Sequence, residues 1–328
     1  MTDDAVDRAT EAARLMVTGV RSRPWGLGVV AVEDGAAVTE IDQGADPFDP
    51  TTLFELGSIT KTMTGFLLAD SVLAGECGLD TAVGDILGPE AGEAARTTLL
   101  QLATHTSGLP RLPVNFAPKD RKDPYADLTS ADLVAALGDL DPLVPGPYVY
   151  SNLGFMLLAL LLERVTGSSY EDLLQDRLLR PAGMGATTTN PPTDGRLPGY
   201  DGPTPVPWWN GPPGSGRVVS TLTDMERYLR LILDPQEAGD RVAAAVELAI
   251  SVHHEGPPTE GLAWVHQGGG IWHNGGTGGC HTFACVYRPT RSAVFLVANG
   301  AGLDVLDKVG FGVITQLARG EIGTPLSG

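Results

Sequence analysis

The chain has 328 residues, of which 42% are hydrophobic and 19% are charged. This length and composition is typical of a globular protein with one large domain or two small ones, and it excludes a disordered, collagen-like or coiled-coil chain. Forty acidic residues against 22 basic ones give a formal net charge of -18, which repels phosphate backbones and anionic lipids. Neither nucleic acid nor a membrane surface is therefore predicted as a partner.

The three cysteines, Cys77, Cys280 and Cys285, form no C-x-x-C pair, so neither a disulfide framework nor a redox site is predicted. The first residues have neither the basic start nor the apolar stretch of a secretory signal, and no run of about 18 apolar residues follows. The sequence therefore predicts a soluble, cytoplasmic protein.

Strands are predicted near both ends of the chain. Apolar spacing over residues 3–20 predicts an amphipathic helix. The Val-rich segments 26–32 and 36–41 then predict an antiparallel hairpin through Asp34-Gly35. Strand composition returns much later, before a final helix over about 305–317, in segments 261–264, 281–287 and 293–299.

The middle of the chain is predicted to be mostly helical. Helical periodicity covers residues 59–73 and 153–165, and amphipathic helices alternate with Pro/Gly turns from about 75 to 200. We therefore expect one α/β (α+β) domain over residues 1–328, in which strands from both ends form one antiparallel sheet. Its sheet subdomain would take residues 1–57 and 215–328, and its helical subdomain 58–214, with a cleft between them.

The first candidate for chemistry is Ser58-Ile59-Thr60-Lys61, at the start of a predicted helix. Side chains three residues apart share a helix face, so the Ser58 hydroxyl and the Lys61 amine can meet as a nucleophile and its base. Free N–H groups at a helix start also favour an oxyanion. The alternative is a chance pair on a surface helix, but Lys61 is the only lysine before Lys119 and, unlike arginine, can lose its proton.

The second candidate is Tyr150-Ser151-Asn152, where a loop meets the predicted helix over 153–165. The Tyr150 phenol can shuttle a proton once a nearby positive charge lowers its pKa, and the Asn152 amide can orient an acyl carbonyl. The alternative is plain helix capping by Ser151 or Asn152, with Tyr150 packed against its neighbours.

The third candidate is His-Asn-Gly-Gly-Thr-Gly-Gly over residues 273–279, on or just after a predicted strand. Glycine allows close backbone approach, so this edge can offer an N–H to an oxyanion, with His273 as a polar or cationic group in the same cleft. A flexible glycine loop is the alternative. A nucleotide-binding loop is excluded, because the Lys-Ser/Thr ending of a phosphate loop is missing.

Neither a metal nor a cofactor is predicted, because the histidines at 253, 254, 266, 273 and 281 lack the spacing of a zinc site. Trp208 and Trp209 lie in the proline-rich loop 203–216. They either cap the cleft as an apolar lid or pack in the core. Trp272 is a further candidate for the pocket lining.

Taken in this order, the three motifs resemble those of the penicillin-recognising serine enzymes, the group of class C β-lactamases, D-alanyl-D-alanine carboxypeptidases and esterases. The likeness also covers residues 54–61, 104–110, 150–155 and 220–225, and so spans roughly 54–299. It implies a β-lactamase/transpeptidase-like fold, in which helices flank an antiparallel sheet beside a mostly helical subdomain. This agrees with the outline drawn from the residues.

The resemblance implies a role for each motif. Ser58 would be the acylated nucleophile, Lys61 its base partner and Tyr150 the proton shuttle, while Asn152 would hold the acyl side chain.

The third motif of the family falls on His273-Asn274-Gly275, and the N–H of Gly276 would join that of Ser58 in the oxyanion hole. Here the chain departs from the pattern. Relatives that bind a substrate carboxylate usually have Thr or Ser where this chain has Asn274, and the commoner first residue is Lys in place of His273.

These residues predict acyl transfer through an acyl-Ser58 intermediate, with a small-molecule ester or amide as the donor. Water as the acceptor would make the protein a hydrolase, which is the function we predict. An amine or alcohol as the acceptor would make it a transacylase of small-molecule biosynthesis. A third alternative is a non-catalytic acyl- or penicillin-binding sensor module, although such modules usually hang on a membrane helix.

Overall fold

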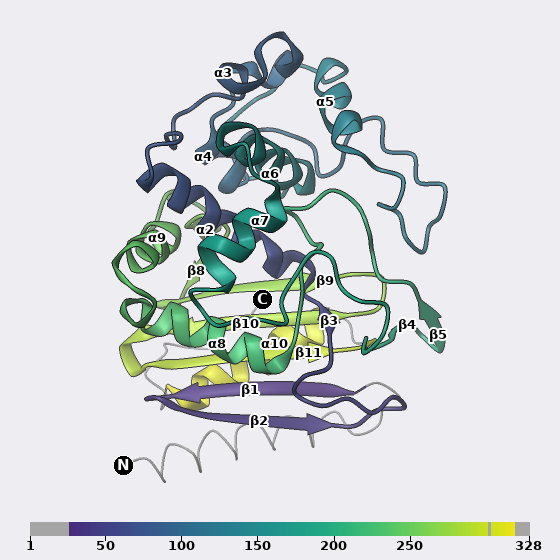
Figure 1. The fold of residues 1–328 in the computed structure, drawn as a ribbon, viewed down its shortest axis with the longest axis vertical. Coiled ribbons are helices and arrows are strands. Elements are labelled where there is room, and N and C mark those ends of the chain that lie inside the picture. Colours follow the sequence, from purple (N-terminus) through teal and green to yellow (C-terminus); the bar gives the residue numbers. More distant parts are fainter. Residues whose placement is uncertain (1–25, 301–302, 319–328) are drawn as a thin grey trace.

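The structure is a computed structural model that describes residues 26–300 and 303–318; the predicted helix over 3–20 lies outside them. Strands from both ends form one seven-stranded sheet in the order β2-β1-β11-β10-β9-β8-β7, as predicted, and every neighbouring pair whose register is given is antiparallel (Figure 1). Its strands are β1 (Leu27–Glu33), β2 (Ala36–Asp42), β7 (Thr259–Glu260), β8 (Val265–Gln267), β9 (Gly270–Gly276), β10 (His281–Tyr287) and β11 (Ser292–Ala298).

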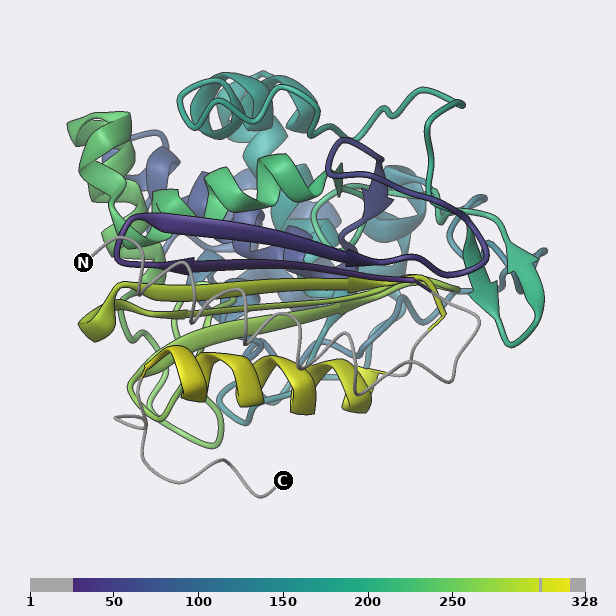
Figure 2. The same cartoon turned by 90° about the horizontal axis from the view of Figure 1, so that it is seen from below.

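The central strands are buried on both faces. In β1, Val29 and Ala31 belong to the apolar cluster that includes helix α10 (Leu303–Leu317), whereas Val30 and Val32 belong to the cluster on the other face. Figure 2 shows α10 beneath the sheet and α8 (Leu222–Leu233) above it. The unbroken apolar run of β1 therefore reflects a sheet enclosed between two helical layers.

Turn chemistry sets the ends of the strands. Asp34 and Gly35 have φ angles of 45° and 83°, which are the left-handed values of the tight turn that joins two antiparallel strands, and the predicted hairpin is confirmed. The predicted strand over 261–264 is wrong, because these residues form a bend between β7 and β8 in which Ala263 has a φ of 69°. Leu262 and Trp264 are nevertheless buried, which explains their strand-like composition.

The middle of the chain forms helices, as predicted, and no helix of the described residues is both long and apolar enough to cross a membrane. The helices and helical turns are η1 (Gly57–Ile59), α2 (Thr60–Leu73), α3 (Val83–Leu87), η2 (Gly88–Arg96), α4 (Leu99–Ala103), α5 (Ser130–Gly138), α6 (Asn152–Thr166), α7 (Tyr170–Leu174), η3 (Gln175–Leu179), η4 (Pro235–Ala238), α9 (Asp240–Ile250) and η5 (Arg288–Thr290). Two short strand pairs complete the fold, β3 (Phe54–Glu55) with β6 (Val219–Ser220) and β4 (Gly199–Asp201) with β5 (Thr204–Val206).

Helix α2 is buried on all sides over its first twelve residues. Its polar side chains are hydrogen-bonded rather than solvated. The Thr62 and Thr64 hydroxyls each lie 2.8 Å from a tyrosine hydroxyl, those of Tyr228 and Tyr170 respectively. Since a buried polar group without a partner is costly, these contacts hold α2 in one position and fix the direction of its first turn.

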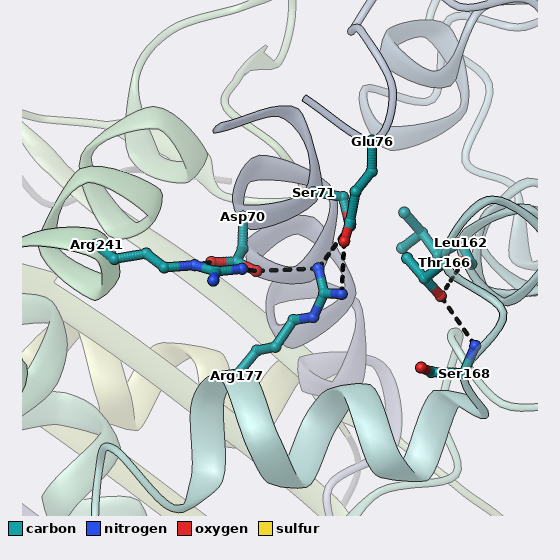
Figure 3. Close-up of polar contacts among 8 residues, drawn as sticks. All are labelled: Asp70, Ser71, Glu76, Leu162, Thr166, Ser168, Arg177 and Arg241. Atoms are coloured by element: carbon teal, nitrogen blue, oxygen red, sulfur yellow. Dashed lines mark hydrogen bonds and ion pairs between the residues drawn. The ribbon is translucent and has the colours of Figure 1, made fainter. Parts of the chain in front are cut away.

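An ion-pair network anchors the other end of α2 (Figure 3). Asp70 is only 1% exposed and accepts two hydrogen bonds of 2.7 Å from Arg241 of α9 and one of 3.1 Å from Arg177 of η3. Arg177 also makes a bidentate pair with Glu76 at 2.7 and 2.9 Å. Asp70 thereby ties α2 to two helices that come later in the chain.

We expect Arg177→Met to lower the free energy of unfolding by about 2 kcal/mol, because it removes a partner from the buried Asp70 carboxylate and leaves Glu76 unpaired. Urea denaturation of both proteins measures the difference. The control is Arg180→Met, which breaks an i,i+4 pair with Asp176 in which both side chains are more than half exposed and should cost less than about 0.5 kcal/mol. Equal losses in the two variants would contradict the anchoring role.

Candidate active site

The site is built around Ser58 in η1, the turn that joins β3 to α2. On one side of it, the Leu56 N–H donates to the Val218 carbonyl at 3.0 Å. On the other side, the Thr282 hydroxyl donates to the Leu56 carbonyl at 2.7 Å. Gly57 has a φ of 54°, a value that glycine adopts at little cost. These backbone contacts hold half-buried Ser58 at the edge of the sheet.

Lys61 lies fully buried beneath Ser58. Its Nζ is 3.0 Å from Ser58 Oγ, 2.9 Å from Asn152 Oδ1 and 2.7 Å from the Ser215 carbonyl oxygen. Burial, aided by the Arg111 cation, lowers the pKa of Lys61 well below its usual 10.5. A neutral amine donates to the two oxygens that can only accept, and it keeps a lone pair for the Ser58 proton. The structure therefore brings the predicted nucleophile and base together.

Tyr150 completes the polar cluster around Ser58. The Lys61 Nζ lies 4.9 Å from the centroid of the Tyr150 ring, and Ser58 and Tyr150 line the same cleft. Burial raises the pKa of Tyr150 to about 12, against the lowering effects of Ser58 and Arg111. Our expectation that a positive charge would lower this pKa is thus wrong, because desolvation outweighs the charge. Tyr150 is a neutral phenol and can donate its proton.

Strand β9 divides its side chains between the two faces of the sheet, as the two-residue period of a strand requires. Trp272 and Asn274 face α10. The Trp272 ring centroid lies 5.2 Å from that of Phe311, and Asn274 Nδ2 donates to Asp307 Oδ2 at 2.9 Å. The prediction that Trp272 lines the pocket is wrong, because the period places it on the face opposite to His273.

His273 faces Lys61 and is 3% exposed. Burial lowers the pKa of His273 to about 3, so the alternative of a cationic His273 is wrong. Its Nδ1 is within hydrogen-bond distance of the Asn274 carbonyl oxygen. Because a carbonyl only accepts, the Nδ1 carries the proton and the Nε2 is an acceptor.

The glycines of β9 pack directly on the Ser58 turn. A Cβ atom on Gly275 would lie 3.0 Å from the Ser58 nitrogen, and one on Gly57 would lie 2.5 Å from the Gly276 nitrogen. Only residues without side chains allow the two backbones to come this close. The backbone nitrogens of Ser58 and Gly276 are thereby brought close together, which is what the predicted oxyanion hole requires.

A cleft of about 440 Å³ opens beside Ser58, and Trp209 and Tyr125 line it. The Trp209 ring lies 5.3 Å from that of Tyr125, and its backbone N–H donates to the buried Glu55 at 2.7 Å. Trp208, by contrast, is buried with Leu53 and Val219. Trp209 therefore lines the cleft, as the predicted lid would, whereas Trp208 packs in the core, which was the other predicted alternative.

Three residues that position the motifs were not predicted from the sequence. The His105 Nδ1 accepts from the Ser151 N–H at 3.0 Å, and its ring lies 4.4 Å from that of Tyr150. Tyr125 accepts from Asn152 Nδ2 at 3.2 Å, and Ser215 offers its carbonyl to Lys61. His105 belongs to the stretch 104–110 that carries the family likeness, whereas the use of a backbone carbonyl leaves no sequence signal.

We expect Gly57→Ala to slow acylation of Ser58 by roughly 10²–10³-fold, because the added Cβ would push Gly276 out of the oxyanion site. Stopped-flow labelling with p-nitrophenyl acetate measures the rate. The matched control is Gly138→Ala, where a Cβ meets nothing within 4 Å. Labelling of Gly57→Ala at the unaltered rate would exclude these N–H groups as oxyanion donors.

Comparison with known proteins agrees with this geometry. The family model described as Beta-lactamase matches residues 15–319. Penicillin-binding protein 4 of Amycolatopsis lactamdurans is 30% identical over 76% of this chain and 72% of its own length. The D-alanyl-D-alanine-carboxypeptidase/endopeptidase AmpH of Escherichia coli K12 is 27% identical over 81% of this chain and 77% of its own.

One further relative and one solved structure also match this chain. Unguisins hydrolase ungD' of Aspergillus campestris is 27% identical over 76% of this chain and 53% of its own. The crystal structure of a class C beta lactamase from Rhodobacter sphaeroides superposes on this chain with a TM-score of 0.81 and 24% sequence identity. The match covers 95% of this chain and 99% of that chain, which establishes the predicted fold. The match of the family model over most of the chain shows that this protein belongs to the beta-lactamase family of serine hydrolases.

Proposed function

We propose that the protein hydrolyses an ester or amide of a small molecule through an acyl-Ser58 intermediate. The observation that carries the proposal is the contact of 3.0 Å between Ser58 Oγ and the buried Lys61 amine. Because burial lowers the pKa of this amine well below 10.5, it loses its own proton more readily and can take that of the attacking hydroxyl, which is the requirement for a serine nucleophile.

Acylation follows from the positions of these groups. As the Ser58 oxygen bonds to the acyl carbon, its proton passes to the Lys61 amine, and the carbonyl oxygen becomes an oxyanion facing the N–H groups of Ser58 and Gly276. Tyr150 donates its phenol proton to the leaving oxygen or nitrogen as that bond breaks. The Lys61 ammonium then returns a proton to Tyr150.

Deacylation runs along the same path in reverse order. A water molecule attacks the acyl carbon, its proton passes through Tyr150 to Lys61, and Ser58 leaves with a proton supplied by the same pair. Glu55 and Glu260 are buried carboxyls that are held by other residues. Glu55 accepts hydrogen bonds from the Trp209 N–H and the Thr277 hydroxyl, and Glu260 accepts one from the Tyr148 hydroxyl. The Lys61-Tyr150 pair therefore serves both half-reactions.

The relatives support hydrolysis rather than transfer. AmpH is named as a peptidase and ungD' as a hydrolase, and the second name agrees with a small-molecule substrate. The complete set of nucleophile, base and proton donor supports turnover over a sensor role. Transfer to an amine or alcohol is the alternative that the experiment below decides, and a cytoplasmic location stays a prediction.

Intact-mass spectrometry tests the proposal directly. After mixing with a panel of p-nitrophenyl esters, β-lactams and D-alanyl peptides, we expect a transient acyl adduct that Ser58→Ala abolishes. The panel is repeated with added amines and alcohols. Adduct decay at one rate regardless of these additives supports hydrolysis, whereas faster decay accompanied by a new acylated amine or alcohol would assign a transacylase. The absence of any Ser58 adduct would overturn both functions.

The pH dependence of acylation reports on Lys61. Below the pKa of Lys61 the amine is protonated and cannot accept the Ser58 proton, so kcat/KM should fall about tenfold per pH unit on the acidic side of a midpoint well below 10.5. We expect Lys61→Arg to lose roughly 10³-fold or more across the range, since a guanidinium keeps its proton.

The buried carboxyl of Glu260 needs a control of its own in this titration. Burial raises the pKa of Glu260 to about 8, so its ionisation falls within the range of the titration. Glu260→Gln removes this ionisation, and the acidic limb should persist in the variant. A limb that disappears with Glu260, or one centred near 10.5, would contradict the assignment of Lys61 as the base.

A further inference from the structure

Arg111 stands beside the cluster of Ser58, Lys61 and Tyr150, on the loop between α4 and α5. Its backbone carbonyl accepts the N–H groups of Asn152 and Leu153 at 2.9 and 3.2 Å, which fixes where its side chain begins. Its guanidinium carbon lies 5.1 Å from the centroid of the Tyr150 ring. The guanidinium is exposed and lines the cleft, and within the described part of the chain no side chain or carbonyl accepts a hydrogen bond from it.

The charge of the cleft is opposite to that of the protein. The chain carries a net charge of -18, yet within the described part of the chain Arg111 is the only permanently charged side chain that lines the cleft beside Tyr150. The carboxyls of Glu55 and Glu260 accept hydrogen bonds from residues other than Arg111. Glu55 is held by Trp209 and Thr277, and Glu260 is fully buried against Tyr148. An arginine so placed attracts an anion from outside the protein.

Other candidates for holding a substrate anion are already occupied. The Asn274 amide is bonded to Asp307 on the far face of the sheet. Arg217 lines a pocket that also includes Ser58, but its guanidinium donates to the carbonyls of Thr189 and Gly211. Arg111 is thus the cation that remains available on the side of the cleft where Tyr150 lies.

The chemistry of Tyr150 identifies which part of the substrate meets Arg111. The phenol gives its proton to the leaving atom, so the leaving group must lie next to Tyr150. A carboxylate a few bonds from that atom would come within reach of the guanidinium, whose planar fork matches a carboxylate. By microscopic reversibility, an incoming acceptor occupies the same place.

We propose that Arg111 is a specificity-determining residue that binds a carboxylate carried by the leaving group, and by an acceptor that takes its place. The inference rests on the proposed function, since it assumes acylation of Ser58. In this proposal the substrate anion is bound by Arg111 on a loop, and not by Asn274, whose amide is bonded to Asp307. It also disfavours protonated amines as acceptors, because the guanidinium repels a second cation.

A pair of isosteric substrates tests the proposal. The 3-carboxyphenyl and 3-carbamoylphenyl esters of the acyl group that the ester panel identifies differ only in charge. We compare kcat/KM for the two, each divided by its uncatalysed rate. The native protein should prefer the carboxylate by roughly tenfold to hundredfold, the range of a charge-assisted hydrogen bond. Arg111→Gln should bring the ratio to about one, and Arg111→Lys to an intermediate value.

Arg121→Gln is the matched control, because it removes the same charge from an exposed position outside the cleft lining and should leave the ratio as it is in the native protein. A ratio that Arg111→Gln does not change, with a normal Ser58 adduct, would overturn this inference alone. A ratio that falls equally in Arg121→Gln would assign the effect to the general field of the protein and overturn it too. The lack of a Ser58 adduct with either ester would overturn the proposed function as well.

Discussion

The structure depends on one costly arrangement, a lysine amine enclosed in the protein beside a serine hydroxyl. Burying an ammonium ion without a counter-ion is unfavourable, and none of the contacts of Lys61 is with a carboxylate. Burial therefore shifts the pKa of the amine well below 10.5, toward its uncharged form. The amide of Asn152 and the carbonyl of Ser215 supply oxygens that accept from a neutral amine. The same desolvation that would destabilise a charged lysine suits it to the role of base in the proposed reaction.

Much of the fold serves to keep this arrangement in place. The three partners of Lys61 come from positions 58, 152 and 215, so the base is assembled by segments that are far apart in the sequence. Helix α2 is fixed on all sides by packing and by the hydroxyl contacts of Thr62 and Thr64, and at its far end by Asp70. A base whose pKa depends on burial needs surroundings that do not open to water, and a rigid helix provides them.

The parts of this site that were predictable are those encoded by local spacing. A serine and a lysine three residues apart on a helix meet wherever that helix packs, and the hairpin at Asp34-Gly35 follows from turn chemistry alone. The remainder depends on distant contacts. The strand-like composition of residues 261–264 came from burial, not from pairing. The neutral states of Tyr150 and His273 could not be inferred, because the sequence shows which residue types are present but not how far each is removed from water. Trp272 could have been placed correctly, since the two-residue period of β9 sets it opposite to His273.

The pairing of β1 with β11 has a consequence for synthesis of the chain. Leu27 lies opposite Ala298 in the sheet, and the glycine strand β9 reaches β1 only through β10 and β11. A ribosome must therefore release nearly the whole polypeptide before the sheet can close and bring Gly276 against the nucleophile turn. Contacts of such sequence separation form late and slowly. The contact between Gly276 and the Ser58 turn joins distant parts of the sequence as well, so it too can form only late in folding.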